Sequence, residues 1–308
     1  MRNPVSENGS MVWVSIITPS LNRRSMLREA IESVLSQRVD DIQHIIVDAQ
    51  SSDGTSELLA EYNHLEVICE PDKGIYDGIN KGLARARGEF IVLLNSDDIL
   101  LPNALDLWLN AFKSAPDADI ISGSAQLVDY ASGALLQRYD DAGNRELGAC
   151  EALLGLPIIN ARMFRRSVFD RIGGFDLAFR TLADRDWLVR AWLEGARNVP
   201  LCEDTYCYRG HLGSATYAQE MSPAKRLSYA QEAATLARHV QGLSTDRELM
   251  RAARILSDKS SASEFMLLLR SMQYEALGAV IVRALSLNPL WPLSVAAILL
   301  ARASGVKP

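Results

Sequence analysis

Two neighbouring aspartates, Asp97 and Asp98, interrupt an apolar part of the sequence. Residues 90–94 are all apolar, the polar group Asn95-Ser96-Asp97-Asp98 follows, and apolar residues resume at Ile99. Adjacent carboxylates at the end of a buried strand repel each other and are costly to remove from water. A divalent cation would offset both costs, because Mg²⁺ and Mn²⁺ take carboxylate oxygens as ligands and share them with substrate phosphates. A cap on the following segment is the simpler alternative for these two residues.

Four predicted strands end in polar clusters of this kind. The strands are short and apolar, and are expected at Val14–Thr18, Ile42–Val47, Leu65–Cys69 and Phe90–Leu94. The clusters that follow them are Thr18-Pro19-Ser20, Asp48–Asp53, Glu70–Lys73 and Asn95–Asp98. Segments with helical spacing separate the strands, which indicates a parallel sheet covered on both faces. Because such sheets bind ligands at the carboxyl ends of their strands, we expect all four clusters on one rim.

The 308 residues are expected to form one α/β domain and a helical region. We predict a disordered tail at residues 1–11, the α/β domain at 12–217 and helices at 218–308. A fifth strand is expected from Asp119 to Ser122, and a helix is predicted to begin near Pro102. Later strands are expected at Gln126–Tyr130, Leu135–Tyr139, Ala161–Phe164 and Val199–Tyr208. A helix from about Asp184 to Glu194 follows from the spacing of its apolar residues.

Charge and composition argue against several classes of protein. The formal net charge is −6 and the pI is about 5.4, whereas a nucleic-acid-binding protein normally carries a basic face. The four cysteines show neither disulfide nor zinc spacing, which favours a reduced, cytoplasmic protein. The N-terminus lacks the apolar core of a secretion signal. The apolar stretch Ala284–Leu300 is too short, and too interrupted by prolines, for a membrane-spanning helix.

The common nucleotide-binding and calcium-binding signatures are absent from the sequence. No GxGxxG follows the first predicted strand and no GxxxxGKS or GxxxxGKT occurs, so neither a dinucleotide fold nor a P-loop is supported. The loop DAQSSDG, which begins at Asp48, has its glycine at the seventh position and not at the sixth that a calcium loop requires. The remaining chemistry is an acidic rim that could hold a divalent cation together with a diphosphate.

Five segments together carry a family resemblance. They are VSIITPSLNR, HIIVDAQSSDGT, EPDKGIYDGINKGLARARGEFIVLLNSDD, MFRRSVFDRIGGFD and ADRDWLVR. In order and spacing they resemble the family-2 glycosyltransferases, especially bacterial members with a DKGIYDxxNKG…LNSDD pattern. The resemblance covers about residues 12–215. It implies a GT-A fold, with a Rossmann-like, mostly parallel sheet flanked by helices, and here an α-helical C-terminal extension. It also implies a nucleotide-sugar donor, Mn²⁺ or Mg²⁺, and inversion at the anomeric carbon.

The resemblance assigns the donor and metal sites to particular residues. Thr18 and Pro19 would line the nucleoside pocket, and Asp48 would accept a hydrogen bond from the base. Asp98 would bind the metal directly, with Asp97 near the ribose and the metal. Three further residues, in the donor loop and the helix after it, would face the nucleotide, namely Asp72, Asp77 and Asn80. From the residues alone, Asp72 could instead be a helix cap and Asp77 could pair with Lys81 four residues on.

The resemblance also assigns a general base. An inverting transfer requires a group that takes the proton of the attacking hydroxyl, and a carboxylate can do this. Asp184 matches the family's base position, and Asp186 is the fallback. By physics alone, either residue could be a first-turn acid that stabilises its helix. His211 lies where many relatives place a histidine facing metal or phosphate, although a loop histidine can also have neither role.

We therefore expect a hexosyltransferase-type, metal-dependent inverting glycosyltransferase of bacterial polysaccharide or glycoconjugate assembly. Its donor would be a nucleotide-diphosphate sugar, and the resemblance implies that the nucleotide is UDP. Its acceptor would be a saccharide or a lipid-linked saccharide. The alternatives are a non-catalytic sugar-nucleotide-binding assembly partner and a sugar-phosphate nucleotidyltransferase, which would require a glycine-rich phosphate loop. Residues 245–308 carry a net charge of +3. The C-terminal helices could pack on the catalytic domain, form a homo-oligomer, or contact the inner face of the cell membrane.

Overall fold

The computed structural model describes residues 13–140, 145–211, 222–271 and 273–292. The predicted disordered tail, residues 1–11, lies outside these ranges. The chain divides into two compact units. The sheet unit comprises residues 1–148 and 156–218, and the helical unit comprises residues 149–155 and 219–308. The segment 149–155 belongs to the helical unit, which the sequence did not indicate.

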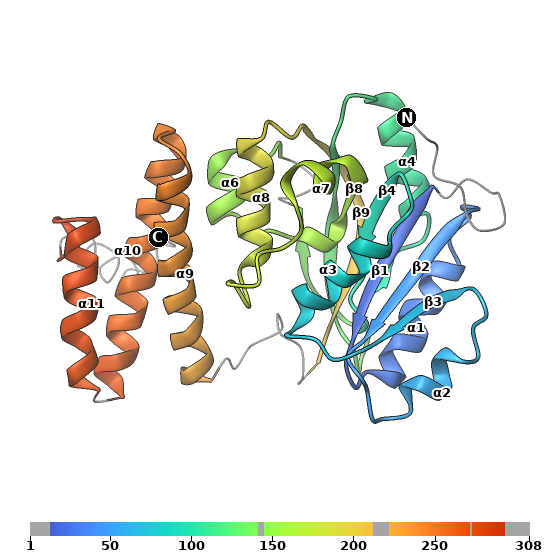
Figure 1. Cartoon of the computed structure of the whole chain (residues 1–308), viewed down its shortest axis with the longest axis horizontal. Helices are drawn as coiled ribbons and strands as arrows, with labels where there is room; N and C mark the ends of the chain where they lie inside the picture. The colour runs from blue at the N-terminus through green and yellow to red at the C-terminus, as the bar shows by residue number, and fades with distance from the viewer. Residues whose placement is uncertain (1–12, 141–144, 212–221, 272, 293–308) are drawn as a thin grey trace. The chain divides into compact units, whose positions relative to one another are not determined.

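The sheet unit is built on a nine-stranded mixed sheet with the order β3-β2-β1-β4-β8-β6-β9-β5, in which β7 pairs with β6 (Figure 1). Strands β1 to β4 are parallel, and β8 runs antiparallel between β4 and β6. The strands are β1 Val14–Ser20, β2 Ile42–Asp48, β3 Leu65–Cys69, β4 Phe90–Leu93, β5 Ile99–Leu100, β6 Ile120–Asp129, β7 Leu135–Tyr139, β8 Arg162–Arg165 and β9 Asn198–Gly210.

Helices cover both faces of this sheet, as the near-continuous apolar strands predict. They are α1 Arg24–Leu35, α2 Thr55–Leu59, α3 Ile75–Arg85, α4 Ala104–Ser114, α7 Arg166–Ile172 and α8 Ala183–Leu193. Ile16 of β1 packs in one cluster with side chains of α1 and α4. Its neighbour Ile17 points to the other face, toward α3. Successive side chains of β1 therefore pack against helices on opposite faces of the sheet.

Helix α3 approaches the sheet unusually closely because of its glycines. A Cβ placed on Gly82 would lie 2.3 Å from Cγ2 of Ile17, and one on Gly78 would lie 3.3 Å from Cβ of Pro19. Any side chain at Gly82 would push the helix away from β1. The helix begins directly after the loop Glu70–Gly74, so this close packing fixes the position of that loop against the carboxyl end of β1.

The structure corrects several predicted element bounds. The strands predicted at Asp119–Ser122 and Gln126–Tyr130 are one continuous strand, β6, which has register shifts between Ser122 and Ala125. Helix α4 begins at Ala104, after Asn103 in the left-handed region with φ +62°, and not at Pro102. The short strand β5 and helix α7 were not predicted. Both are too short for a hydrophobic period to distinguish them from loops.

The helical unit contains α9 Pro223–Leu243, α10 Arg247–Arg270, α11 Tyr274–Leu287 and the short α6 Ala149–Leu154. Ser222 and Asp246 cap the first two helices with their side chains. One buried carboxylate, Glu264 of α10, accepts from Gln231 of α9 and pairs with Arg283 of α11. This contact joins the three helices. Among the described residues, no helix is long and apolar enough to cross a membrane.

A buried histidine makes the sheet unit sensitive to acid. His44 of β2 is 1% exposed, and its Nε2 lies 3.0 Å from Oγ1 of Thr18. Burial, and secondarily the charge of His64, lowers the pKa of His44 from 6.5 to about 3. The folded protein therefore keeps His44 neutral, whereas the unfolded chain binds a proton below about pH 6.5. The resulting stability is present above that pH and is lost as pH falls toward 3.

We expect His44→Gln to weaken this acid sensitivity. Between about pH 6 and 4, the free energy of unfolding of the wild type should fall by about 1.4 kcal/mol more per pH unit than that of the variant. Glutamine keeps a polar group near Thr18 but does not titrate. Urea unfolding at several pH values, followed by tryptophan fluorescence, measures the two slopes. Parallel slopes would show that His44 does not control acid unfolding.

Candidate functional site

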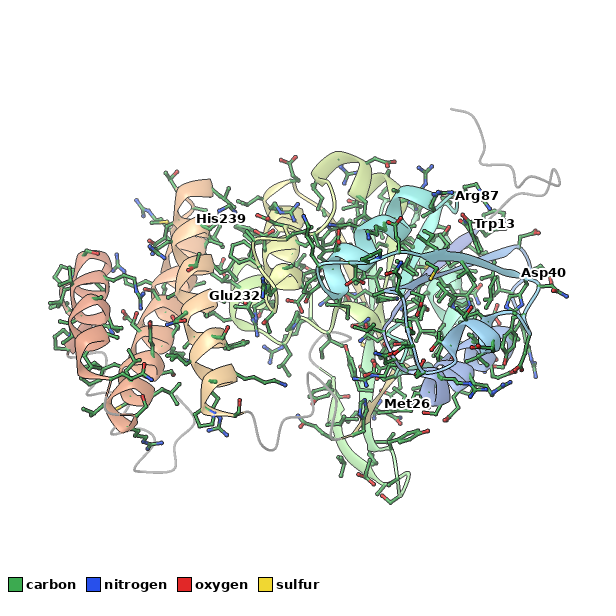
Figure 2. All side chains as sticks on the ribbon, turned by 60° about the horizontal axis from the view of Figure 1, so that its bottom comes forward. Trp13, Met26, Asp40, Arg87, Glu232 and His239 are labelled. Carbon is green, nitrogen blue, oxygen red and sulfur yellow. The ribbon has the colours of Figure 1, made fainter. Side chains whose placement is uncertain are left out.

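The polar clusters predicted to share a rim do lie together at the carboxyl ends of β1, β2 and β3. In the sheet register Ser20 is opposite Asp48, and Asp48 is opposite Cys69. The backbone continues this contact beyond the strands, because Ala49 N donates to Ser20 O at 2.9 Å. Figure 2 marks both ends of the sheet. Met26 lies at the rim end, whereas Trp13, Asp40 and Arg87 lie at the opposite end.

Asp98 is turned into the protein and is only 4% exposed. Its Oδ2 accepts from the Tyr206 hydroxyl at 2.9 Å and from Asn95 Nδ2 at 3.0 Å. Its Oδ1 accepts from the Arg209 backbone N–H at 3.0 Å. Burial, followed by the charge of Asp97, raises the pKa of Asp98 to about 7. The structure thus gives this carboxylate three protein partners, whereas the sequence analysis expected it to face a metal directly.

Asp97 is the accessible carboxylate of the pair, with 20% of its side chain exposed. Its Oδ2 lies 3.1 Å from Nε2 of His211, which follows β9, and 3.9 Å from Nε of Arg23, which precedes α1. His211 is 114 residues away in sequence and reaches Asp97 because β9 pairs with β6 and β5. The structure therefore brings together two of the three residues predicted to bind the metal.

The Asp97–His211 pair suits a divalent cation as part of its coordination shell. Carboxylate oxygen and imidazole nitrogen are both metal ligands, and these two atoms are adjacent and partly exposed. Within the described residues, however, no group of three or more such side chains could hold a metal alone. Mg²⁺ commonly takes only one or two protein carboxylates, and substrate phosphates and water complete its shell.

Arg209 holds the Asp97–Asp98 turn against helix α1. It is 4% exposed, and its Nε donates to the Asp97 carbonyl at 2.7 Å. Its Nη1 pairs with Glu29 at 2.6 Å, and its Nη2 donates to the Met26 carbonyl at 2.9 Å. Every nitrogen of this buried guanidinium thus has an acceptor, and its charge is balanced by Glu29.

We expect Arg209→Gln to weaken metal-dependent nucleotide binding about 10- to 100-fold, as removal of outer-shell partners of metal ligands does. Calorimetric titration of UDP with Mn²⁺ measures this, and thermal unfolding checks that the variant is folded. Arg28→Gln is the matched control, because Arg28 lies on α1, the helix that Arg209 contacts, but pairs with the exposed Glu61. Equal affinity in the Arg209 and Arg28 variants would show that Arg209 does not position the turn.

The residues predicted for the nucleoside pocket have different surroundings. Thr18 is fully buried and contacts His44, so its side chain does not reach the rim. Asp48 accepts from the Ser51 N–H at 2.9 Å and from its hydroxyl at 2.5 Å. Asp72 accepts from the Gly74 N–H at 2.9 Å, and its Oδ2 lies close to Gly78 and thereby to Pro19. Pro19 and Asp72 thus meet across the start of α3.

Asp77 and Asn80 have structural partners. Asp77 accepts from the Lys73 N–H at 2.9 Å and lies 3.8 Å from Lys81, so the alternative ion pair is present. Asn80 is occupied on both sides, because its Nδ2 donates to Phe175 O and its Oδ1 accepts from Phe175 N, each at 2.8 Å. A Cβ on Gly174 would lie 2.3 Å from Asn80 Oδ1. Asn80 therefore joins α3 to the segment at Gly174 and Phe175 through hydrogen bonds of its side-chain amide.

The two candidate bases at the start of α8 differ sharply in exposure. Asp184 is partly exposed in the first turn of the helix, and its Oδ1 accepts from the Arg185 N–H at 2.8 Å. Asp186 is fully buried and pairs with Arg190 at 2.8 Å. Arg190 also donates to the carbonyls of Ile172 and Gly174. Asp186 is thus buried in an ion pair that holds the turn before α8, and Asp184 is the accessible carboxylate of the two.

Two tyrosines of β9 connect the acidic turn with the start of α8. Tyr206 bonds Asp98, and its ring lies 4.8 Å from that of Tyr208. Burial first, then the charges of Asp98 and Asp184, raises the pKa of Tyr208 well above its usual range. Both aspartates thus act electrostatically on one hydroxyl. The sequence analysis did not identify these tyrosines as site residues. Which side chains of a strand reach a site is known only when the neighbouring strands are known.

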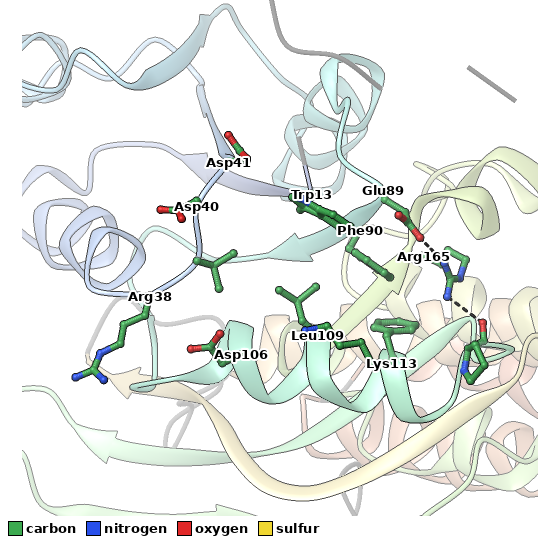
Figure 3. Close-up of a pocket in the computed structure, with 13 residues that line it drawn as sticks. Trp13, Arg38, Asp40, Asp41, Glu89, Phe90, Asp106, Leu109, Lys113 and Arg165 are labelled. Carbon is green, nitrogen blue, oxygen red and sulfur yellow. Dashed lines mark hydrogen bonds and ion pairs between the residues drawn. The ribbon is translucent and has the colours of Figure 1, made fainter. Parts of the chain in front are cut away.

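A separate cavity of about 650 Å³ lies at the opposite end of the sheet (Figure 3). Its walls include the aromatic residues Trp13, Phe90 and Phe112, with Arg165 bound to Glu89 at its edge. None of the predicted site residues lines it. Because parallel sheets bind ligands at the carboxyl ends of their strands, the rim and not this cavity is the candidate active site.

Known structures share this fold. A fragment of S. aureus TarS in complex with UDP-GlcNAc aligns with a TM-score of 0.61 at 16% identity, over 92% of this chain and 82% of that one. The mannosyltransferase PcManGT from Pyrobaculum calidifontis, in complex with GDP-Man and Mn²⁺, aligns with a TM-score of 0.58 at 17% identity, over 92% and 86%. The expected GT-A fold with added C-terminal helices is thereby confirmed.

Sequence comparison gives the family. EpsH of Bacillus subtilis is 32% identical over 120 residues, which are 38% of this chain and 35% of EpsH. TuaG of the same species is 39% identical over 90 residues, 28% of this chain and 36% of TuaG. The matches thus span about a third of these two relatives. An uncharacterized glycosyltransferase of Mycobacterium tuberculosis is 30% identical over 185 residues, 58% of this chain and 69% of that protein. The model of glycosyl transferase family 2 matches residues 15–185, more than half of the chain, and the chain belongs to this family.

Proposed function

We propose that this protein is an inverting glycosyltransferase that moves a sugar from a nucleotide-diphosphate sugar to a hydroxyl acceptor. The observation that carries this proposal is the arrangement of two carboxylates along one rim. Asp97 pairs with His211 at one position, and Asp184 lies in the first turn of α8 at another. Burial first, then the charges of Asp98 and Asp184, raises the pKa of Tyr208. One position suits a cation and diphosphate, and the other suits a proton acceptor.

Asp97 and His211 are the proposed metal ligands. Arg23 adds a positive charge beside Asp97, in a loop that follows the carboxyl end of β1. A divalent cation bound here would supply positive charge that neutralises the departing diphosphate. Asp98 takes a different role, because its three hydrogen bonds hold the turn that presents Asp97. Pro19, Asp48 and Asp72 surround the neighbouring part of the rim, where we place the nucleoside.

Asp184 is the proposed general base. It would accept the proton of the acceptor hydroxyl as that oxygen attacks the anomeric carbon. Its position is fixed by α8, since Trp187, one turn further, is fully buried against Phe164 and Phe169 and donates to the Gly173 carbonyl at 3.1 Å. A rigid support of this kind is what a positioned base requires.

UDP is the proposed nucleotide. Structures of S. aureus TarS contain UDP-GlcNAc and UDP, whereas that of the mannosyltransferase PcManGT contains GDP-Man and Mn²⁺. The proposed setting is cell-surface polysaccharide assembly. TuaG is named as a teichuronic acid biosynthesis glycosyltransferase. A chondroitin synthase of Escherichia coli is 28% identical over 182 residues, which are 58% of this chain and 26% of that protein. The acceptor would then be a saccharide or a lipid-linked saccharide.

Calorimetric titration of UDP, GDP and dTDP tests the proposal, with each nucleotide measured in Mn²⁺ and in EDTA. We expect UDP to bind in Mn²⁺ and to bind much more weakly in EDTA. Equal binding in both buffers would remove the metal from the site. Binding of none of the three nucleotides would contradict the proposed function and favour a non-catalytic assembly partner.

A further inference from the structure

The rim contains a second buried arginine, Arg162, the first residue of β8. It is 4% exposed, and its contacts are with neutral groups only. Nη1 donates to the Ser122 hydroxyl and to Asn198 Oδ1, and Nε donates to the Pro157 carbonyl at 3.3 Å. Burial lowers the pKa of Arg162 from 12.5 to about 10, so the side chain remains charged at neutral pH. Burying such a charge without a counter-charge is costly.

Arg209, at the same rim, is a buried arginine whose charge and hydrogen-bond donors are all satisfied by other residues of the protein. Both arginines are 4% exposed, but Arg209 pairs with Glu29 and donates from every nitrogen. Arg162 pairs with no carboxylate among the described residues, and its Nη2 donates no hydrogen bond there. This Nη2 is also not sealed from solvent. The two sites therefore differ in one respect, the missing anion beside Arg162.

Arg162 lies on the part of the rim where the transferred sugar and the acceptor would meet. Because β8 runs antiparallel to β4, its first residue is at the carboxyl end of β4. Asn160, two residues earlier, donates to Asn95 Oδ1 at 3.3 Å and so touches the acidic turn. The charge of Arg162 also acts on Tyr208, which senses Asp184. Arg162 thus lies at the carboxyl end of β4, two residues from the Asn160 side chain that contacts the acidic turn.

We propose that Arg162 binds the carboxylate of an acidic sugar, so that the substrate of this enzyme carries a uronic acid. This inference rests on the proposed function, because it assigns a substrate class to the same site. A carboxylate matches the single charge of the guanidinium and its one nitrogen, Nη2, that donates to no described residue. A phosphate dianion would bring more charge and would require further donors. The uronic acid belongs either to the donor or to the acceptor, and the same contact serves both.

Two pairs of probes distinguish these sources. In the donor arm, calorimetry with Mn²⁺ compares UDP-glucuronic acid with UDP-glucose, which differ only at C6. In the acceptor arm, p-nitrophenyl β-D-glucuronide is compared with p-nitrophenyl β-D-glucoside on protein saturated with UDP and Mn²⁺. We expect the acidic probe to bind at least about tenfold more tightly in one of the two arms, as a charged hydrogen bond would give. UDP alone is titrated in parallel.

Variants then assign the preference to Arg162. Arg162→Met should abolish it and leave the affinity for UDP unchanged, whereas Arg162→Lys, which retains the charge, should keep part of it. Arg38→Gln removes an equal charge from an exposed position at the opposite end of the sheet and should change neither value. If Arg162→Met does not fold, the wild-type comparison and the Lys variant still decide the matter.

The outcomes separate this inference from the proposed function. UDP binding without preference for either acidic probe would overturn the inference alone, and so would a preference that survives in Arg162→Met. Absence of UDP binding to the wild type would overturn the proposed function, and the inference with it. A preference in one arm that is lost in Arg162→Met identifies the sugar that carries the carboxylate.

Discussion

An Asp184→Asn variant is expected to transfer sugar about 10²- to 10⁴-fold more slowly than the wild type, the usual contribution of a general base. Asparagine has nearly the same shape but cannot accept the proton of the attacking hydroxyl. Its side-chain oxygen can still accept from the Arg185 N–H, so the first turn of α8 should persist. Single-turnover transfer from the donor sugar that the titrations select measures the rate.

The affinity for UDP with Mn²⁺ should be unchanged in Asp184→Asn, because this residue is assigned to the acceptor hydroxyl and not to the nucleotide. Asp186→Asn is the matched control two residues away. That substitution removes a charge from a fully buried pair with Arg190, so it should lower thermal stability but not the rate per folded molecule. A fall in rate in the Asp186 variant, with no fall in the Asp184 variant, would reverse the assignment.

Asp97→Asn should weaken Mn²⁺-dependent binding of UDP by at least about 100-fold, since loss even of an outer-shell partner of a metal ligand costs 10- to 100-fold. Binding in EDTA should change little. His211→Gln should show the same pattern, because its Nε2 lies 3.1 Å from the Asp97 carboxylate. Calorimetry across a range of Mn²⁺ concentrations measures the affinity for the metal separately from that for the nucleotide.

Asp98→Asn distinguishes the two neighbouring carboxylates. An amide would place a donor against the Tyr206 hydroxyl, the Asn95 amide or the Arg209 N–H, all of which donate to the aspartate. We expect a loss of stability of about 1–3 kcal/mol from the mismatched hydrogen bonds. The affinity for Mn²⁺ should fall less than in Asp97→Asn. A larger fall in the Asp98 variant would restore Asp98 as the direct ligand.

The parallel half of the sheet could be predicted from the sequence for a clear physical reason. A strand buried on both faces is apolar at nearly every position, and Val14–Thr18 and Ile42–Val47 lie within such strands, whereas Leu65–Cys69 forms the partly exposed edge strand β3. The carboxyl ends of parallel neighbours must coincide, so the polar residues after these strands had to share a rim. The antiparallel half was less predictable, since β6 bends through register shifts and β5 has two residues.

The roles of individual rim residues depended on contacts that are distant in sequence. Nothing in the local sequence distinguishes Asp97 from Asp98, because the two residues have the same chemistry at nearly the same place. Their difference arises from residues more than 100 positions away, Tyr206 and Arg209, which donate hydrogen bonds to Asp98. Asn80 likewise appeared suited to a nucleotide until Phe175, 95 residues later, was found to occupy its amide.

Residue types and spacing alone were therefore sufficient for the fold class, the rim and the family resemblance, because apolar runs, helical spacing and motifs are local properties of the chain. Folding decided which carboxylates remain accessible, since burial and hydrogen-bond partners belong to the packed sheet. It also decided that Arg209 has a counter-charge in Glu29 whereas Arg162 pairs with no carboxylate among the described residues. The sequence does not show whether an arginine has a counter-charge. Only the residues that contact it in the folded protein show whether its charge is balanced.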